Sequence, residues 1–330
     1  MFDSFVIFGG VGFIGTHMQR LLREKYPDSK VYIADLLADS SMDQKDAAVS
    51  YQKVDVRKPI EMQGEFGKNT LVFNFAAIHR TPGHPDHAYY ETNIRGAENV
   101  CEFARKYGIE NIVFTSSIAT YGAAEELKTE DTLPTPNTPY GIAKLVAEKT
   151  HEEWAAENSN HRLSIVRPGI VFGTGENGNM TRLYFALKSH KFAYAGRKDT
   201  IKACIYVKDL VRIMLEMAEK SSNETTDKVQ LYNCCYYPSY TIEQICNAMM
   251  VATGMKRFIP FIPKKPMMMV ASVCGLMGGL GLGICPARVK KLMISTNVDG
   301  KKLSQSYSLK YSLEEAFKDW FKDCDEKVLE

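Results

Sequence analysis

Short apolar runs alternate with longer amphipathic segments through the first half of the chain. The runs are rich in β-branched and aromatic residues, and the segments between them repeat apolar residues at the spacing of an α-helix. The runs are SFVIF, KVYIAD, VSYQKVDV, TLVFNFAA, NIVFTSS and LSIVRPG. Strands that alternate with helices are typical of a parallel sheet, because each crossover between parallel strands needs a helix. The pattern therefore predicts an α/β fold with a doubly wound parallel sheet covered by helices.

The pattern changes near position 170. A loop rich in Gly and Asn comes first, and it is followed by the predicted strand and helix of CIYVKDLVRIMLEMAE, the strand VQLYNCC and a last helix near SLEEAFKDWF. We predict a first domain over residues 1–170, with strands near 203–235 returning to its sheet. Residues 171–330 are predicted to form mainly a smaller, mixed α/β lobe.

A run without charged side chains spans residues 266–287, PMMMVASVCGLMGGLGLGICPA, and basic residues flank it on both sides. Its length reaches the thickness of a bilayer's hydrocarbon core, but five glycines weaken it as a helix. Three interpretations are open: a buried lid or core helix, which we favour, a face that rests on the membrane, and a transmembrane helix. In the second, residues 266–291 would contact the membrane surface peripherally.

Composition and charge exclude several classes of function. The chain has 330 residues, 45% of them hydrophobic and 24% charged, which suffices for one large core or two interlocked ones. The formal net charge of +2 creates no strong field for nucleic acid, and no RNA-binding or zinc-finger signature is present, so we expect no nucleic-acid partner. The amino terminus enters a predicted strand without a signal-peptide pattern, which favours the cytoplasm, or its membrane face if the uncharged run touches lipid.

The cysteines and histidines predict neither disulfides nor a metal centre. None of the eight cysteines has CxxC spacing, and most lie in apolar surroundings typical of reduced core thiols. His79, His84 and His87 cluster in the loop HRTPGHPDH. No carboxylate or thiolate cluster completes a metal-ligand set around them, so no metal is expected.

Candidate chemistry starts directly after the first predicted strand. Gly9, Gly12 and Gly15 have GxxGxxG spacing between a strand and a helix. Glycines at such a turn let the backbone approach a diphosphate, which then meets the amide groups at the amino end of the helix. Asp35 ends the next predicted strand, where a carboxylate accepts hydrogen bonds from the adenosine ribose and repels a 2′-phosphate. The pattern predicts NAD, rather than NADP, bound to a Rossmann-type sheet; a solvated loop carboxylate is the alternative for Asp35.

A second candidate site lies in the stretch YGIAK. Tyr140 and Lys144 stand four residues apart in a predicted helix and share one face of it. An ammonium group so placed lowers the pKa of a phenol and makes a phenolate accessible near neutral pH. Ser117 follows a predicted parallel strand at its carboxyl end, where open α/β sheets bind ligands, and its hydroxyl could share a substrate oxygen with Tyr140. Alone, the Tyr/Lys pair would be a solvated helix face; the glycine turn and Ser117 favour an active site.

The ordered set of motifs resembles one enzyme family over nearly the whole chain. The motifs are GGVGFIG, Asp35, Asp55 in KVDV, NFAA, NIRGAENV, FTSSIATYG, YGIAK and RPGIVFG. They look like the extended short-chain dehydrogenase/reductase family, in its NAD-dependent epimerase/dehydratase branch. The resemblance implies that Tyr140 is the catalytic acid and base, that Lys144 holds the nicotinamide ribose and tunes Tyr140, and that Ser117 orients the substrate oxygen. The cofactor contacts that it implies are Gly9, Gly12, Phe13, Ile14, Gly15, Asp35, Asp55, Val56, Ala76, Ala77, Asn93, Ser116, Tyr140, Lys144, Arg167 and Pro168.

Two stretches in the second half of the chain are NGNMTRLYFALKSHKFAYAGRKDTIKACIYVKDL and ARVKKLMISTNVDGKKL. They are similar to bacterial 4-epimerases of N-acetylglucosamine. The resemblance extends to the group that acts on the polyprenyl-diphosphate-linked sugar, and UDP-linked sugar is the other carrier that it allows. It implies that Asn179 and Arg288 meet the diphosphate, with His79 and Ser117 also near the substrate. Lys202 stands where many nucleotide-sugar epimerases carry an arginine, and a lysine keeps the positive charge but loses the bidentate contact with UDP. A homodimer is expected.

Two other functions are compatible with the same motifs. One is a net oxidoreductase, either a sugar-nucleotide 4-ketoreductase or dehydratase or an enzyme that resembles 3β-hydroxysteroid dehydrogenase. The other is a regulatory protein that binds NAD without turnover. The complete set of Ser117, Tyr140 and Lys144 disfavours the second, because a protein without turnover would tolerate the loss of any of them.

Overall fold

The chain forms two compact units in the computed structural model, which describes residues 2–39, 41, 46–79, 83–122, 124–223, 227–266 and 293–330. Unit 1 comprises Met1–Gly122, Glu130–Pro168 and Val207–Cys234. Unit 2 comprises Ala123–Thr129, Gly169–Tyr206 and Cys235–Glu330. The assignment of a cofactor domain and a substrate lobe to these parts of the chain stays a prediction.

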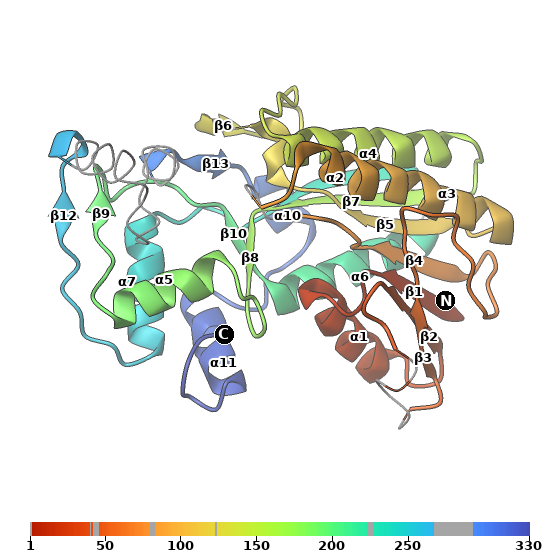
Figure 1. The fold of residues 1–330 in the computed structure, drawn as a ribbon, viewed down its shortest axis with the longest axis horizontal. Coiled ribbons are helices and arrows are strands. Elements are labelled where there is room, and N and C mark those ends of the chain that lie inside the picture. Colours follow the sequence, from red (N-terminus) through yellow and green to blue (C-terminus); the bar gives the residue numbers. More distant parts are fainter. Residues whose placement is uncertain are drawn as a thin grey trace. The chain divides into compact units, whose positions relative to one another are not determined.

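A seven-stranded parallel sheet forms the centre of unit 1 (Figure 1). Its strands are β1 (Ser4–Phe8), β2 (Lys30–Asp35), β3 (Val49–Lys53), β4 (Thr70–Asn74), β5 (Asn111–Thr115), β7 (Arg162–Pro168) and β11 (Val229–Cys234). They lie in the order β11-β7-β5-β4-β1-β2-β3, and every neighbouring pair is parallel. The predicted doubly wound parallel sheet is confirmed. The strand order reverses between β1 and β4, and ligands of open α/β sheets bind at the carboxyl ends of the strands there.

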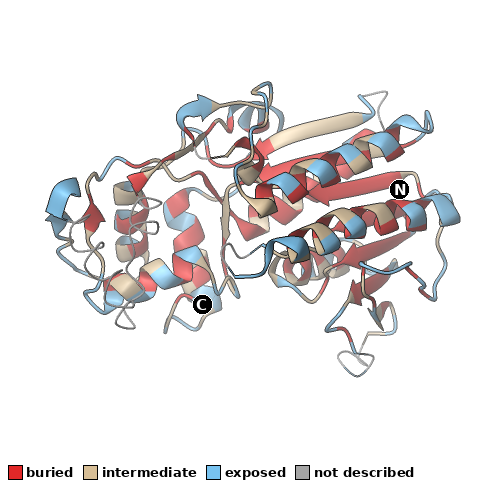
Figure 2. Ribbon diagram, turned by 45° about the horizontal axis from the view of Figure 1, so that its top comes forward, coloured by how far each residue is buried: buried red, intermediate tan, exposed pale blue. Residues whose placement is uncertain are grey.

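Burial on both faces explains why these strands are nearly continuous apolar runs. Every residue of β1, β4 and β5 is buried, as expected of a parallel sheet covered by helices. Figure 2 shows the inner strands in red between helices that are exposed along one side only, whereas the edge strands β3 and β11 are only partly buried. The sheet thus provides a rigid base, and the loops at its carboxyl edge carry the candidate chemistry.

Helices cover both faces of the sheet in unit 1 (Figure 1). Helix α3 packs against α4, and α1 packs against α6. The helical segments are α1 (Phe13–Lys25), α2 (Asp86–Tyr89), the π-helix η1 (Tyr90–Ile94), α3 (Arg95–Tyr107), the 3₁₀-helix η2 (Ile118–Tyr121), α4 (Pro139–Ala156) and α6 (Val207–Asn223). Helix α4 begins where the sequence provides start signals: the Thr138 hydroxyl accepts a hydrogen bond from the Gly141 amide at 3.1 Å, and Pro139 occupies the first turn.

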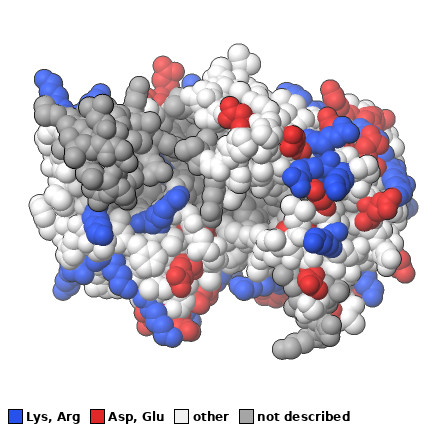
Figure 3. Space-filling model, viewed as in Figure 1, with Lys and Arg blue, Asp and Glu red and all other residues white. Residues whose placement is uncertain are grey.

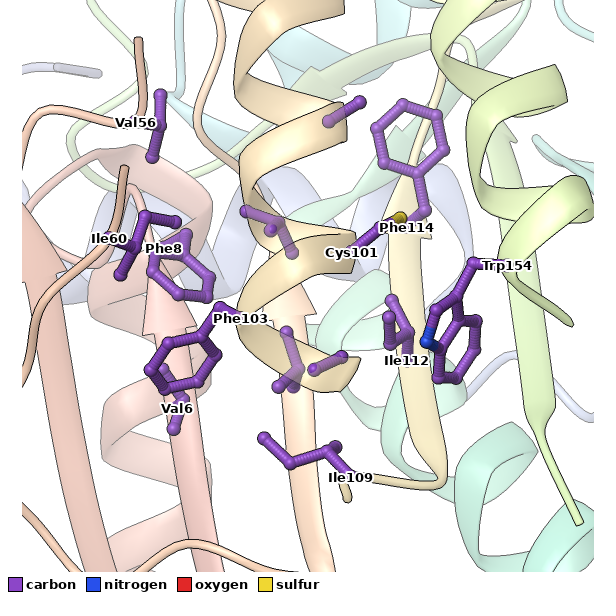
Figure 4. Packing of buried hydrophobic residues seen from close by; sticks show 14 of the residues in the cluster. Val6, Phe8, Val56, Ile60, Cys101, Phe103, Ile109, Ile112, Phe114 and Trp154 are labelled. Carbon is purple, nitrogen blue, oxygen red and sulfur yellow. The ribbon is translucent and has the colours of Figure 1, made fainter. Parts of the chain in front are cut away.

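One hydrophobic core lies between the sheet and helices α3 and α4. Figure 4 shows Phe103 of α3 facing Val6 and Phe8 of β1, with Ile112 and Trp154 on the α4 side. The rings of Phe8 and Phe103 meet edge to face at a centroid distance of 5.5 Å. These large buried side chains fix α3 and α4 on the sheet, and so they position the residues that α4 carries toward its carboxyl edge.

Unit 2 combines short parallel strand pairs with helices. The pairs are β6 (Ala124–Lys128) with β13 (Thr296–Val298), β8 (Ile170–Phe172) with β10 (Cys204–Tyr206), and β9 (Tyr194–Ala195) with β12 (Phe261–Ile262). The helices with described bounds are α5 (Asn179–Lys188), α7 (Ile242–Ala252), α10 (Lys301–Ser306) and α11 (Leu313–Asp323). Phe172 stacks on Phe317 of α11 at 4.8 Å, and Trp320 lies beside them. This aromatic cluster provides unit 2 with a core of its own.

The surface of unit 1 mixes both signs of charge. Figure 3 shows acidic and basic side chains interspersed over the region of α3 and α4. Ion pairs account for part of this mixture, such as Arg105 with Glu157 at 2.5 Å and Lys149 with Glu152 at 2.6 Å. Such a surface has no large field of one sign on this face.

Several predictions fall on residues outside the described ranges. Residues 267–292 are among these, and they include Arg288 and all but the first residue of the uncharged run. Within the described ranges, no helix is long and apolar enough to span a bilayer. The same ranges contain no group of three or more potential metal ligands. Of the six cysteines that they contain, five are buried.

Candidate active site

The glycine turn between β1 and α1 has room only for glycine at two positions. Gly9 has φ +77°, and a Cβ atom there would lie 2.8 Å from the amide nitrogen of Ala76. A Cβ atom on Gly15 would lie 2.5 Å from the Gly9 carbonyl oxygen. Helix α1 therefore starts directly against the turn, and its N-cap, Gly12, provides no side chain to cap the first amides. This cradle fits the diphosphate of a dinucleotide, because amide groups at the start of a helix bind anions.

Asp35 is tied to the same turn. One carboxylate oxygen accepts a hydrogen bond from the amide of Val11 at 3.1 Å, and the other accepts one from the amide of Leu37 at 3.0 Å. Each oxygen retains a further lone pair for a ligand. The backbone thus fixes the orientation of the carboxylate at the end of β2; its predicted contact with the adenosine ribose stays a prediction.

Asparagine side chains hold the loops that follow β3 and β4 at the carboxyl edge of the sheet by hydrogen bonds. Asn93, which is buried, accepts a hydrogen bond from the Ile78 amide at 2.9 Å and donates one to the Ile78 carbonyl at 3.1 Å. This double contact holds the loop after β4, which contains Ala76 and Ala77. Asn99 donates in the same way to the carbonyl oxygen of Val56 at 2.7 Å, in the loop after β3. Asn93 therefore shapes the loop along the predicted cofactor path.

Two other predicted cofactor residues differ in their surroundings. Asp55 is engaged by Arg57 at 2.7 Å, and hydrogen bonding from this guanidinium lowers the pKa of the Asp55 carboxyl. Ser116 follows β5 and is only 1% exposed. Its hydroxyl oxygen has no hydrogen-bond partner among the described residues. A buried polar atom without a partner is costly, so a bound ligand that meets Ser116 would stabilise this site.

Ser117 and Tyr140 meet at the carboxyl edge of the sheet. The Ser117 hydroxyl accepts a hydrogen bond from the amide of Ala119 at 3.1 Å, which caps η2, and it is also hydrogen bonded to the Tyr140 side chain. The prediction that Lys144 lowers the pKa of Tyr140 below its ordinary value is wrong. Burial raises the pKa of Tyr140 above its ordinary value, and the Ser117 hydrogen bond offsets only part of this effect.

Lys144 lies one helical turn beyond Tyr140 and is almost completely buried. Its side chain is 2% exposed, and the ammonium donates to the Thr115 carbonyl at 2.8 Å. It also lies 4.9 Å from the ring centroid of Phe114, in cation–π contact. Burial lowers the pKa of Lys144 to about 7, although the negative charge of Glu148 opposes this shift. The structure thus gathers the three predicted catalytic side chains at one place, with their roles still predictions.

A buried ion pair that the sequence patterns did not predict lies beside this site. Glu148 is completely buried, and Arg167 at the end of β7 contacts both of its carboxylate oxygens, at 2.8 and 2.6 Å. The remaining Arg167 nitrogen donates to the Tyr121 hydroxyl at 2.8 Å, which in turn donates to Asn233 at 2.9 Å. Arg167 was predicted to contact the cofactor, and its guanidinium is occupied by these internal partners. The available signal was the spacing: Glu148 follows Lys144 by the same four residues that separate Lys144 from Tyr140.

His151, on the next turn of α4, is held as a neutral ring. Its Nδ1 lies 2.7 Å from the Ala147 carbonyl, which only accepts, so we assign the proton to Nδ1. Nε2 then accepts from the Asn74 amide at 3.3 Å, and the ring stacks on Phe114 at 4.2 Å. Burial lowers the pKa of His151 from 6.5 to about 4. This ring therefore stays uncharged near neutral pH.

We expect the free energy of unfolding to fall as the pH drops from 6.5 toward about 4, because only the unfolded chain binds a proton at His151 in this window. The folded pKa is depressed, so the stabilisation is present above the unfolded pKa and is lost in acid. Full development of the shift corresponds to roughly 3 kcal/mol. Urea unfolding of wild type and His151→Phe across this pH range measures the effect. The free energy of unfolding should change less steeply with pH in the variant than in wild type. Equal slopes would show that the buried His151 ring does not have a depressed pKa.

The predicted substrate residues of unit 2 make contacts within that unit. Asn179 opens α5, and its side-chain oxygen accepts from Arg182 at 3.0 Å. The Lys202 ammonium donates to the Ile294 carbonyl at 2.7 Å. His79, in unit 1, is exposed in the loop after β4. The substrate roles of these residues stay predictions, and that of Arg288 lies outside the described residues.

Glu176 is a further unit 2 residue that the sequence analysis did not single out. Its carboxylate accepts hydrogen bonds from the amides of Thr181 at 2.9 Å and Met180 at 3.3 Å, and it thereby caps the first turn of α5. A carboxylate also interacts favourably with the positive end of a helix dipole. Glu176 therefore fixes the start of the helix on which Asn179 lies.

Known proteins resemble this chain over most of its length. The N-acetyl-alpha-D-glucosaminyl-diphospho-ditrans,octacis-undecaprenol 4-epimerase of Escherichia coli O157:H7 is 28% identical over 317 residues, which are 93% of this chain and 90% of that protein. The UDP-glucose 4-epimerase of Bacillus subtilis is 23% identical, and the match covers 80% of this chain and 86% of that protein. The solved structure of the UDP-Glc/GlcNAc 4-epimerase of Campylobacter jejuni shares the fold, with a TM-score of 0.72 and 20% identity, and the match covers 98% of this chain and 100% of that one.

A family model matches residues 5–235, which include the glycine turn, Ser117, Tyr140 and Lys144. The match covers well over half of the chain and carries the description of the NAD dependent epimerase/dehydratase family. The parallel sheet and the glycine cradle at the start of α1 agree with a dinucleotide cofactor. The chain is therefore a member of the NAD dependent epimerase/dehydratase family, an enzyme of the extended short-chain dehydrogenase/reductase type with NAD as its cofactor.

Proposed function

We propose that this enzyme is a 4-epimerase of diphosphate-linked N-acetylglucosamine that serves the assembly of a surface polysaccharide. The observation that carries the proposal is the contact of Ser117 with Tyr140 at the carboxyl edge of the sheet, with the Lys144 ammonium buried one turn away. The choice of sugar is supported by the Escherichia coli relative, whose name specifies an N-acetylglucosaminyl diphosphate and which aligns with 93% of this chain.

The polar residues around the glycine turn would hold the cofactor. The turn at Gly9 and Gly15 and the start of α1 would receive its diphosphate, and Asp35 would receive the adenosine ribose. When bound, NAD supplies a group that accepts a hydride from the sugar and returns it. The close packing of the glycine turn against the loop at Ala76 gives this cradle a fixed shape.

Tyr140 would move the proton in both directions. As a phenolate it removes the proton of the sugar 4-hydroxyl, and as a phenol it gives the proton back once C4 has been reduced from its other face. Ser117 holds the same oxygen by a hydrogen bond while its charge changes. Lys144 stabilises the phenolate through its positive charge, which offsets the penalty that burial imposes on the ionised form. The 4-keto sugar would have to turn within the site so that it presents its other face. Because the sugar is neither oxidised nor reduced overall, no cofactor would be consumed.

The carrier of the sugar is proposed to be a polyprenyl diphosphate, with UDP as the alternative. The name of the Escherichia coli relative supports the lipid carrier. Several solved structures with the same fold are of UDP-sugar epimerases instead, but their identity of 20% supports the fold alone. The two carriers share a diphosphate and differ in what lies beyond it.

The carrier can be tested with purified enzyme and two substrates. UDP-N-acetylglucosamine is offered in buffer, and polyprenyl-diphosphate-linked N-acetylglucosamine is offered in vesicles, with Tyr140→Phe as the inactive control. We expect the galacto epimer to form on the lipid-linked sugar at a rate at least about tenfold above that on UDP-sugar. Rapid conversion of UDP-sugar with no conversion in vesicles would contradict the lipid carrier, and failure with both would contradict the proposed sugar.

A further inference from the structure

The buried face of α4 carries three functional groups in a row. Tyr140, Lys144 and Glu148 follow one another at intervals of four residues, which places them on one side of the helix. Lys144 is 2% exposed and Glu148 is 0% exposed. A carboxylate so deep in a fold is rare unless a cation pairs with it, and here two cations are near.

Arg167 clamps the Glu148 carboxylate from the neighbouring strand. Nε and Nη2 of Arg167 donate to the two oxygens at 2.8 and 2.6 Å, in the bidentate geometry that fixes a carboxylate most firmly. The Tyr121 hydroxyl receives the third donor at 2.8 Å, and the Tyr121 ring lies under the guanidinium at 4.8 Å. Glu148 therefore has one available orientation, and its charge is fixed relative to Lys144.

Below the Lys144 pKa of about 7 this cluster carries one excess positive charge. Lys144 and Arg167 are then cationic, Glu148 is anionic, and His151 is neutral because of its burial. Elements packed on α4 bring other ionisable groups: Tyr89 of α2, Glu91 of η1, Tyr121 of η2, and Glu98, Glu102 and Arg105 of α3. Of the charged ones, Glu91, Glu102 and Arg105 are exposed and Glu98 is partly so, and water screens them. Glu148 is therefore the buried charge that acts most directly on the ammonium.

We propose that Glu148 is a positioning residue of the active site: its carboxylate, clamped by Arg167, keeps the Lys144 ammonium charged and in place against the Thr115 carbonyl. The inference rests on the proposed function of Tyr140 and Lys144 as a proton-transfer pair. Because Glu148 is completely buried and both of its oxygens are bonded to Arg167, we expect it to act through Lys144 and not by contact with sugar or cofactor.

The consequence for catalysis follows from the coupling of the two titrating groups. Loss of one proton from the pair yields either a phenolate beside an ammonium, which is productive, or a phenol beside a neutral amine, which is not. The charge of Glu148 favours the ammonium and hence the productive form. Its removal makes the pair lose its first proton at lower pH and also makes a smaller share of the pair productive.

Glu148→Gln tests this inference, because it removes the charge and keeps the shape. We expect kcat for epimerisation to fall about tenfold or more, and the rise of kcat on the acid side of its pH profile to move about one unit to lower pH.

Arg167→Met leaves the negative charge of Glu148 without its partner, so it should move this acid limb of the profile to higher pH. The matched control is Glu153→Gln, an exposed position of the same helix, which should leave both kcat and the limb unchanged.

A second measurement keeps this test separate from that of the proposed function. The side-chain carbon of Lys144 is titrated by isotope-edited NMR in the absence of sugar, with Lys144→Arg to assign its signal. Glu148→Gln should lower this titration by about one unit, whether or not any sugar is a substrate. If Glu148→Gln does not fold, Arg167→Met provides the test, because loss of the guanidinium leaves the negative charge of Glu148 uncompensated and should move the Lys144 titration to higher pH. A folded Glu148→Gln variant in which the Lys144 titration stays in place or moves to higher pH, or a folded Arg167→Met variant in which it stays in place or moves to lower pH, overturns the proposal.

Discussion

Tyr140→Phe is expected to lower kcat for epimerisation on the order of a hundredfold or more. The substitution removes only the hydroxyl that is hydrogen bonded to Ser117, so the ring and its 6.4 Å contact with Tyr89 remain. The fold and the affinity for NAD should therefore stay close to those of wild type. Steady-state turnover and NAD binding, measured on the same preparation, separate the two effects.

Tyr107→Phe is the matched control for this prediction. It makes the same chemical change in unit 1, where the Tyr107 ring packs on Phe66 and Phe103 at 4.9 Å from each. We expect its turnover to match that of wild type. If Tyr140→Phe retained most of the wild-type turnover, Tyr140 could not be the group that moves the proton.

Gly15→Ala is expected to weaken NAD binding at least about tenfold, because it forces the glycine turn open. Alanine is favoured over glycine inside a helix by about 1 kcal/mol. That gain is too small here, since the new Cβ atom would lie 2.5 Å from the Gly9 carbonyl oxygen and 2.6 Å from the Cα atom of Gly10. Both are backbone atoms, which cannot move without changing the cradle. Overpacking of this kind costs about 1–3 kcal/mol.

Gly67→Ala is the corresponding control. A Cβ atom at Gly67 would meet nothing within 4 Å, so neither stability nor cofactor affinity should change. The measurement is the dissociation constant of NAD for the two variants and for wild type. Equal affinity of Gly15→Ala and wild type would show that the turn does not contact the cofactor.

The central sheet and the glycine turn could be predicted because their signals are local. Strands buried on both faces are continuous apolar runs, as in β1 and β4, and such runs are visible without any knowledge of neighbours. The close backbone contacts at Gly9 and Gly15 are also recognisable in the sequence, since only glycine fits there. The pairing of β6 with β13 cannot be recognised in this way, because it joins strands that lie far apart along the chain.

The predicted site was incomplete where contacts depend on the neighbours of a strand or helix. The spacing of Tyr140 and Lys144 was readable, but the bond between Arg167 and Glu148 depends on how β7 lies against α4. The same holds for the pKa of Tyr140, which burial raises although the sequence suggested a lowering by Lys144. The Asn93 contacts with Ile78 likewise depend on the path of the loop after β4.

Transfer of a hydride from C4 and its return to the same carbon is the step that defines the proposed reaction. The most direct test uses N-acetylglucosamine labelled with deuterium at C4 on the carrier that the enzyme accepts, with enzyme and NAD in water. We expect the galacto product to keep its deuterium at C4, with no net formation of NADH. Loss of the label to solvent, or NADH released in proportion to the sugar consumed, would contradict epimerisation by Tyr140 and bound NAD.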